Sequence, residues 1–323
     1  MLELAYHGVR VLDAHAHFPV GWTPGSDLHP ILREYNRQRT RRMDREWDFP
    51  ETRDPVPSVD DEEGIRAVAD RWAAEVERYG LERIVFVTGG GNDLLARIVR
   101  MHPDKFLGMM HHDPTAPGAV EEARRAYEEL GLVAYKMFGP RWSIPFEAPE
   151  VRPLWEFLAE HRIPVLIHFG LLGRGGGVAW HERINPLSLF PVARDFPEIP
   201  FIVPHFGCGY PRELLHLMWS CPNVYVDTSG SNQWMRWHDS ELTLEYLFKK
   251  FYETVGPERI IFGSDSSWFP RGFAVRYLQD QLRACYYLGM KDEDIDRIFY
   301  RNAAELFGLE PRRRPEDGEG TKS

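Results

Sequence analysis

The feature that most constrains the fold is a regular alternation of short apolar runs with helix-like segments. Eight runs rich in Val, Ile, Leu and Phe recur at intervals of roughly 25–40 residues. They are Val9–Ala16, Arg83–Thr88, Phe106–His111, Leu132–Met137, Ile163–His168, Ile199–Pro204, Asn223–Asp227 and Arg259–Gly263. Each is followed by a segment with helical signals, the first of which begins with Ser58 as its expected cap. Strands separated by helices predict parallel pairing.

Eight such units predict a single α/β domain, a (β/α)8 TIM barrel spanning residues 1–310. An open doubly wound sheet is the alternative, but no glycine-rich phosphate loop follows the early strands. The polar segment 18–57 is too long for a simple connection, and we expect an insertion that serves as a lid or an interface. The tail at 311–323 is almost free of apolar residues and is expected to be disordered.

Composition excludes several classes of function. The net charge of −10 provides no basic surface for nucleic acid or an anionic membrane. No apolar run reaches the ~20 residues of a membrane span, and the amino terminus does not resemble a secretion signal. Three cysteines without CxxC spacing are typical of a reducing cytoplasm. We therefore expect a cytoplasmic protein whose partner is a small-molecule substrate.

The first apolar run ends in an HxH motif. With a two-residue period, Asp13, His15 and His17 share one face of the strand, whereas Ala14 and Ala16 take the other. Two imidazoles on one face can bind one metal ion. A catalytic zinc site has about three protein ligands, so the motif alone is an incomplete site. The alternative is that both are merely polar residues at the edge of a loop.

Other polar residues stand where the later strands end. Barrel enzymes place their chemistry at the carboxyl ends of the strands, so these residues would meet at one rim. They are Lys136, His168, His205 and Asp265. Imidazoles with one carboxylate and no thiolate suit one divalent metal, Zn²⁺ first and then Mn²⁺ or Fe²⁺.

These residues resemble the amidohydrolase superfamily, in its amidohydrolase-related branch of aminocarboxymuconate-semialdehyde and resorcylate-type decarboxylases. The stretches that carry the resemblance are VLDAHAH, LVAYKMFGP, PLWEFLAEHRIPVLIHFG, FPEIPFIVPHFG, CPNVYVDTSG, RIIFGSDSSW and RNAAELFGL. They run from the first strand to the last helix and exclude the insertion and the tail. The branch commonly forms dimers, which implies a homodimer.

The resemblance also implies roles for individual residues. His15, His17, His168 and Asp265 would bind the metal, and His205 would be the catalytic acid or base, with Asp265 relaying a proton. A strand-four lysine is carboxylated and bridges two metals in binuclear relatives. For Lys136 we favour a contact to a substrate carboxylate, or an ordinary place in the barrel lining. His111 and His112 end the third strand, and either one faces the site or both pack in the loop.

Loop residues suggest the shape of the substrate. Arg183, Trp234, Arg236 and Trp268 follow strands five, seven and eight. Aromatic walls with an arginine suit a planar substrate that carries a carboxylate. The alternative is that these tryptophans pack the rim or a subunit interface.

Three functions remain open from the sequence. We favour a hydrolase that attacks an ester, lactone or amide of a small carboxylated or aromatic compound through a metal-activated water. A non-oxidative decarboxylase of an aromatic or muconate-type acid would use the same ligands, and the fold does not decide between them. A protein that binds metal or ligand without catalysis is the third.

Overall fold

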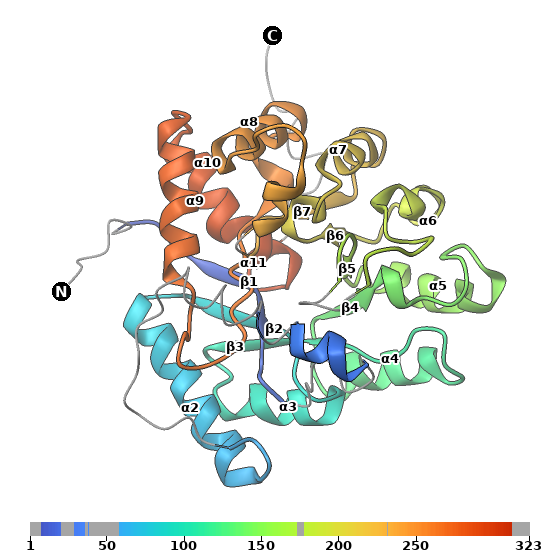
Figure 1. Ribbon diagram of the computed structural model, residues 1–323. Coiled ribbons are helices and arrows are strands. Elements are labelled where there is room, and N and C mark those ends of the chain that lie inside the picture. The colour runs from blue at the N-terminus through green and yellow to red at the C-terminus, as the bar shows by residue number, and fades with distance from the viewer. Residues whose placement is uncertain are drawn as a thin grey trace.

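The protein forms a parallel barrel, as predicted. The computed structural model describes residues 8–20, 29–35, 38, 58–172, 178–230 and 232–311. Eight parallel strands pair in chain order, and helices surround them (Figure 1). The strands are β1 (Leu12–His17), β2 (Arg83–Thr88), β3 (Phe106–Met110), β4 (Ala134–Phe138), β5 (Val165–His168), β6 (Phe201–Val203), β7 (Val224–Asp227) and β8 (Ile260–Ile261).

Backbone contacts between the first and last strands close the barrel. Ala16 pairs with Ser266 in parallel, and the His17 amide donates to the Ser266 carbonyl over 2.7 Å. The Asp265 amide donates to the His15 carbonyl over 2.8 Å. The closure therefore fixes the end of β1 against the segment that follows β8. This confirms the predicted (β/α)8 barrel.

Two apolar layers hold this architecture. Seven of the eight strands contribute buried residues to an inner cluster, with Val85, Met109, Leu166 and Ile202 among its members, and Tyr225 of β7 packs against it. The larger outer cluster lies between the strands and the helices, which is the usual two-layer packing of a barrel. The last helical segment contacts β1 and β8 and adds Phe307 to the inner cluster, so it closes the end of the barrel opposite the carboxyl ends of the strands.

The expected two-residue alternation along β1 is broken. Leu12 and Ala14 pack in the inner cluster, as alternation predicts, but Ala16 packs in the outer one. Pairing with β2 shifts register between Asp13 and Ala16, which is the irregularity a bulge produces. The prediction that Ala14 and Ala16 share a face was therefore wrong, because it assumed a regular strand.

The helices follow the predicted order with shifted ends. They are α2 (Glu62–Tyr79), α3 (Asn92–Met101), α4 (Ala119–Glu128), α5 (Arg152–Glu160), α6 (Phe190–Asp195), α7 (Pro211–Ser220), α8 (Leu244–Val255), α9 (Val275–Tyr287), α10 (Asp292–Asp296) and α11 (Asn302–Leu306). The cap of α2 is Asp61, whose carboxylate accepts from the Gly64 amide. Ser58 does not cap it, because its hydroxyl bonds Asp60 in the preceding turn.

The last predicted helix is interrupted. A π-helical turn, Arg297–Arg301, separates α10 from α11. The Ile298 carbonyl in this turn accepts the Phe262 amide, and the Asn302 amide group donates to the Ile260 carbonyl. These contacts end β8 after two residues, so it is shorter than the predicted run.

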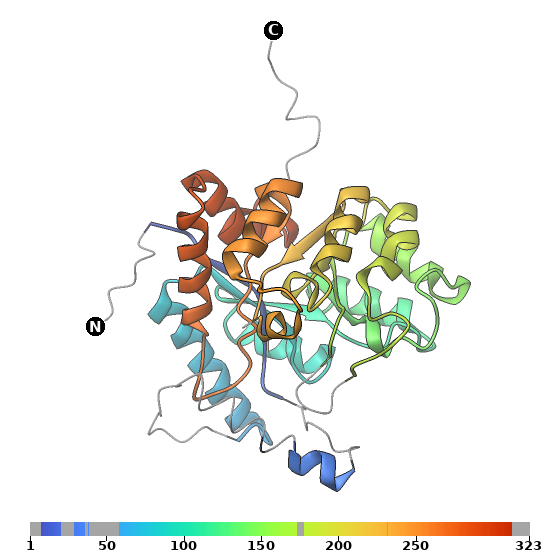
Figure 2. The ribbon, with the colours of Figure 1, turned by 45° about the horizontal axis from the view of Figure 1, so that its top comes forward.

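The predicted insertion and tail lie largely outside the described residues. Within 18–57 the structure describes residues 18–20, 29–35 and 38, of which 30–35 are helical and stand clear of the barrel in Figure 2. Pro311 is the sole described residue of the predicted tail. Among the described helices, none combines the length and apolar character needed to cross a membrane.

Candidate metal centre

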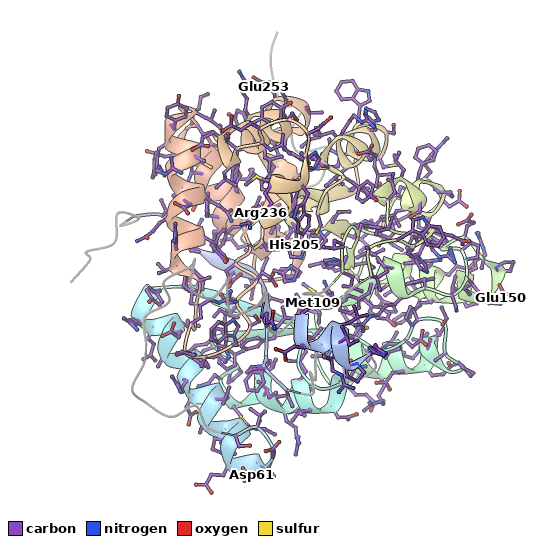
Figure 3. The ribbon with its side chains drawn as sticks, viewed as in Figure 1. Asp61, Met109, Glu150, His205, Arg236 and Glu253 are labelled. Atoms are coloured by element: carbon purple, nitrogen blue, oxygen red, sulfur yellow. The ribbon has the colours of Figure 1, made fainter. Side chains whose placement is uncertain are left out.

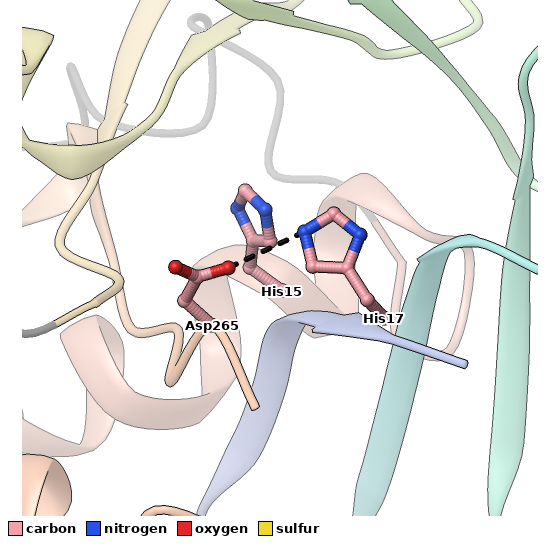
Figure 4. A group of neighbouring side chains, drawn as sticks. All are labelled: His15, His17 and Asp265. Carbon is pink, nitrogen blue, oxygen red and sulfur yellow. Dashed lines mark ion pairs between the residues drawn. The ribbon is translucent and has the colours of Figure 1, made fainter. Parts of the chain in front are cut away.

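Three predicted ligands meet at the rim where the barrel closes. One ligand atom each from His15, His17 and Asp265 lies within 4.8 Å of the other two (Figure 4). The His17 Nε2 atom is 3.3 Å from the Asp265 Oδ1 atom. Two strand ends that are about 250 residues apart in sequence thus supply one cluster, as barrel closure requires.

His15 is oriented as a metal ligand usually is. Its Nδ1 atom lies 2.6 Å from Asp227 Oδ2, and both side chains are fully buried. Burial lowers the pKa of His15 well below its ordinary value and keeps the ring neutral. The buried Nε2 atom has no hydrogen-bond partner among the described residues. A carboxylate behind one nitrogen and an unpaired second nitrogen are the arrangement that fits a divalent metal.

His17 and Asp265 are held by neighbouring groups. The His17 Nδ1 atom lies 2.7 Å from the Thr88 hydroxyl, which turns Nε2 toward Asp265. Asp265 has a positive φ of 55°, and the Arg271 guanidinium donates to its carbonyl over 2.9 Å. Positive φ is uncommon outside glycine and is often found at functional sites.

Asp265 is ionised at neutral pH. Its side chain is 40% exposed but lies within the mouth of the barrel. Desolvation there acts to raise the pKa of Asp265, yet the hydrogen bond from His17 and the nearby imidazoles outweigh it and hold the pKa well below its ordinary value. A carboxylate is therefore available to a cation.

His168 lies next to this cluster rather than within it. Its Nε2 atom is 3.1 Å from the Leu171 carbonyl, which can only accept, so Nε2 carries the proton. Burial lowers the pKa of His168 well below its ordinary value. Its ring centroid is 5.1 Å from that of His205. The structure thus brings the fourth predicted ligand to the same rim but not into the three-residue group.

His205 presents one defined nitrogen to the site. Its Nδ1 atom is 3.1 Å from the Ser229 carbonyl, which assigns the proton to Nδ1 and leaves a lone pair on Nε2. The ring lies 5.1 Å from that of His15. Figure 3 shows His205 among the side chains at the centre of the barrel. Its φ of 58° is a second positive value at this rim.

Lys136 lies in the same interior. Its side chain is buried, and desolvation lowers the pKa of Lys136 to about 7 despite the attraction of Asp227 and Asp265. Its Nζ atom lies 4.9 Å from the centre of the Phe138 ring. A pKa of about 7 means that both the neutral amine and the ammonium form of Lys136 are populated at neutral pH.

The predicted substrate residues are placed differently from one another. Arg183 is buried beside a hollow of about 370 Å³, lined by residues such as Phe146, Glu182 and Phe190 and by none of the predicted metal ligands. Trp234 is buried, with its indole nitrogen donating to Asn232 over 3.3 Å.

The other two predicted substrate residues are more open. Arg236 is exposed and lies on the loop after β7 (Figure 3). Trp268 is half-buried, with the Arg271 guanidinium 5.7 Å from its ring.

The histidine pair after β3 has a packing role. The His111 Nε2 atom accepts from the Gly89 and Gly91 amides over 3.3 and 3.0 Å. The His112 Nε2 atom donates to the Ala119 carbonyl over 2.9 Å. Both imidazoles therefore hold loops in place, in agreement with the expectation that the two histidines pack in the loop.

Asp227 and Ser229 contact the site histidines, and neither was predicted from the sequence to be a site residue. Asp227 ends β7 just as His168 ends β5, so a polar residue closing an apolar run was the available signal. The Ser229 amide donates to Asp227 over 2.6 Å, and the Ser229 hydroxyl lies 2.9 Å from His205. Ser229 carries no signal of this kind, because its contacts depend on the loop conformation.

Two proteins of known activity are similar to this chain in sequence. A 2-keto-4-carboxy-3-hexenedioate hydratase of Sphingobium sp. is 24% identical, over 93% of this chain and 96% of the relative. A gamma-resorcylate decarboxylase of Rhodococcus jostii is 23% identical, over 71% of this chain and 78% of the relative.

A solved structure shares the fold. The 5-carboxyvanillate decarboxylase of Novosphingobium aromaticivorans, complexed with manganese and a nitrobenzoic acid, has a TM-score of 0.62 and 17% identity over 95% of this chain and 98% of its own. The amidohydrolase family model matches residues 12–309, which is nearly the whole chain. The chain therefore belongs to the amidohydrolase family.

Proposed function

We propose that the protein is a metal-dependent lyase that removes CO₂ from a small, planar, unsaturated acid. The observation that carries the proposal is the geometry of His205, which offers one nitrogen for proton transfer beside the candidate metal-binding group of His15, His17 and Asp265. Decarboxylation needs a proton delivered to carbon as the carboxylate leaves, and one positioned histidine supplies it. The decarboxylases among the relatives support this choice over hydrolysis.

His15, His17 and Asp265 would hold the metal, and His168 would join them from the end of β5, on the other side of the barrel. Zinc is our first choice for imidazoles with one carboxylate, followed by manganese or iron. When bound, the ion supplies Lewis-acid polarisation of the substrate oxygens. Asp227 keeps the His15 ring in the tautomer that leaves Nε2 available.

His205 would act on carbon. In its protonated form the Nε2–H group gives its proton to the substrate carbon that bears the carboxylate. The bond from that carbon to the carboxylate then breaks, its electrons stay with the carbon framework, and CO₂ leaves. Solvent returns the proton to Nε2, while the Nδ1–H group stays on the Ser229 carbonyl. Ser229 therefore fixes which nitrogen exchanges protons.

Hydration of a carbon–carbon double bond is the second candidate. The hydratase relative spans 93% of this chain, a larger share than the decarboxylase relative. Hydration also needs a proton placed on carbon, so His205 would keep its role. Hydrolysis, which the sequence favoured, is not confirmed by the relatives reported above.

The test is product analysis with metal-loaded protein. The panel holds 2,6-dihydroxybenzoate, 5-carboxyvanillate and 2-keto-4-carboxy-3-hexenedioate, with an ester and a lactone of similar size. Decarboxylation predicts stoichiometric CO₂ from one of the acids, and a His205→Asn variant should lose it while keeping its metal. Hydration would appear as loss of conjugated absorbance without CO₂. Turnover of only the ester or lactone would overturn the lyase assignment.

A further inference from the structure

The turn after β4 presents a cation that the sequence did not single out. The 3₁₀ turn Gly139–Arg141 follows β4 directly, and the Arg141 side chain is exposed at the rim. Its guanidinium carbon lies 4.9 Å from the centre of the Phe138 ring. The Lys136 ammonium lies 4.9 Å from the same centre. Two basic side chains thus share one aromatic ring at the end of one strand.

This ring belongs to the wall of the candidate site. Lys136 and Phe138 are two residues apart on β4 and so take the same face of the strand. The Phe138 ring centroid is 6.3 Å from that of His168. The positive charge of Arg141 also acts on Lys136, which in turn feels the charges of Asp227 and Asp265. Arg141 therefore lies on the mouth side of Phe138, with Lys136 deeper.

The backbone that carries Arg141 is fixed on both sides. A side chain at Gly139 would come within 2.8 Å of the Arg183 carbonyl, so the turn is packed tightly against the loop after β5. Trp142 is buried and stacks on Trp155, with the ring centroids 5.7 Å apart and the planes 7° from parallel. The backbone that carries Arg141 is thus held in place by its packed neighbours.

Neither Arg141 nor Lys136 forms an ion pair with a carboxylate among the described residues, although the charges of Asp227 and Asp265 act on Lys136 from farther away. Within the described part of the chain, no hydrogen bond or ion pair of Arg141 or Lys136 is observed besides their contacts with the ring. By contrast, Arg125 pairs with both Asp93 and Glu122. A guanidinium fork without a carboxylate at the rim of a site is suited to receive one from a ligand.

We propose that Arg141, with Lys136 and the Phe138 ring, recognises a second carboxylate of the substrate, so that the preferred substrate is a planar dicarboxylic acid. This inference rests on the proposed function for the identity of the reacting carboxylate. The carboxylate that reacts lies at the histidine cluster, and the second one lies toward the mouth against Arg141. The ring of Phe138 stacks on the planar framework between them.

The test is binding of two probes, isophthalate and benzoate, which differ by one carboxylate. Calorimetry on the metal-loaded full chain should show isophthalate binding about tenfold more tightly than benzoate, the gain from one charge-assisted contact. In an Arg141→Gln variant the two probes should bind equally, with benzoate unchanged. Arg141→Lys should retain part of the preference, because it keeps the charge but loses the fork.

Arg152→Gln is the matched control. Arg152 is an exposed arginine that also stacks on a phenylalanine, at 5.3 Å from the Phe196 ring, but it lies on α5 outside the barrel. This variant should keep the full preference for isophthalate. Equal binding of the two probes by the wild-type chain, or a preference that survives Arg141→Gln, would overturn the inference.

The two proposals fail separately. If the panel acids are not turned over but Arg141→Gln removes the preference for isophthalate, the carboxylate site stands and the lyase assignment falls. If CO₂ is released and kcat/KM for a dicarboxylate is the same in Arg141→Gln as in the wild type, the lyase assignment stands and the role of Arg141 falls.

Discussion

The His15 Nδ1 atom lies 2.6 Å from the Asp227 Oδ2 atom, inside a barrel where both side chains are fully excluded from solvent. Burial raises the pKa of Asp227 to about 6, so the carboxylate is mostly ionised at neutral pH. An ionised partner holds the proton of His15 on Nδ1 and leaves Nε2 without one. This pair determines which nitrogen of His15 a metal can reach.

Replacing Asp227 should weaken metal binding. Asp227→Asn keeps the size of the side chain but removes the negative charge behind His15, and we expect affinity for zinc to fall about 10–100-fold. Competition with a chromogenic chelator measures the effect. Asp280→Asn, on the partly exposed face of α9, is the control and should bind zinc as the wild type does. Equal affinity in Asp227→Asn and Asp280→Asn would show that the pair is not needed.

Replacing His205 should separate catalysis from metal binding. Asparagine tolerates the positive φ of this position better than most residues, so His205→Asn is expected to fold. Loss of a positioned acid should lower kcat by about 100–10,000-fold. Metal content should stay at the wild-type value, because His205 is outside the three-residue group. A variant that loses metal together with activity would contradict this division of roles.

His111 should matter for stability rather than chemistry. Its ring accepts two backbone amides of the loop after β2, and His111→Leu leaves both without that acceptor. We expect the free energy of unfolding to fall by about 1–3 kcal/mol, with metal content unchanged. His216→Leu, at an exposed position on α7, controls for the loss of an imidazole. Loss of metal in His111→Leu would instead place His111 in the site.

Lys136 should give a pH-dependent stability. Its pKa is about 7 in the folded chain and 10.5 ordinarily, so between these values the unfolded chain holds a proton that the folded chain has released. The buried charge of Lys136 therefore lowers the free energy of unfolding by its full amount below pH 7, and this destabilisation disappears as the pH approaches 10.5.

A Lys136→Met variant removes the buried charge and with it this destabilisation. In the metal-free protein it should be more stable than the wild type by at most about 5 kcal/mol near pH 6, with the difference shrinking steadily up to pH 10. Denaturant unfolding at several pH values measures the difference. A difference that does not change with pH would mean that Lys136 titrates normally in the folded chain.

The barrel was predictable because its signal is repeated. Each strand is an apolar run of the kind found in a buried parallel sheet, and eight repeats leave few alternative folds. Exact ends were less predictable, because tertiary contacts set them. The contact between Phe262 and the π-helical turn shortens β8, and no local pattern in RIIFG signals that contact.

The site was predictable where polar residues end apolar runs. His15, His17 and Asp265 were found in this way and lie together. The distance of His168 from that group was not predictable, because it depends on the carbonyl of Leu171 in the following loop. The role of Arg141 was also hidden, since its neighbours Lys136 and Phe138 are brought to it by the turn after β4.

The most direct test of the central claim is the metal content of the purified full chain. Elemental analysis after purification without chelator, followed by zinc loading and desalting, should find about one equivalent of a divalent metal per chain. A His15→Ala variant handled in parallel should fall well below that value. A wild-type content under about 0.3 equivalents after loading, or an equal content in His15→Ala, would contradict the assignment of this rim as a metal centre.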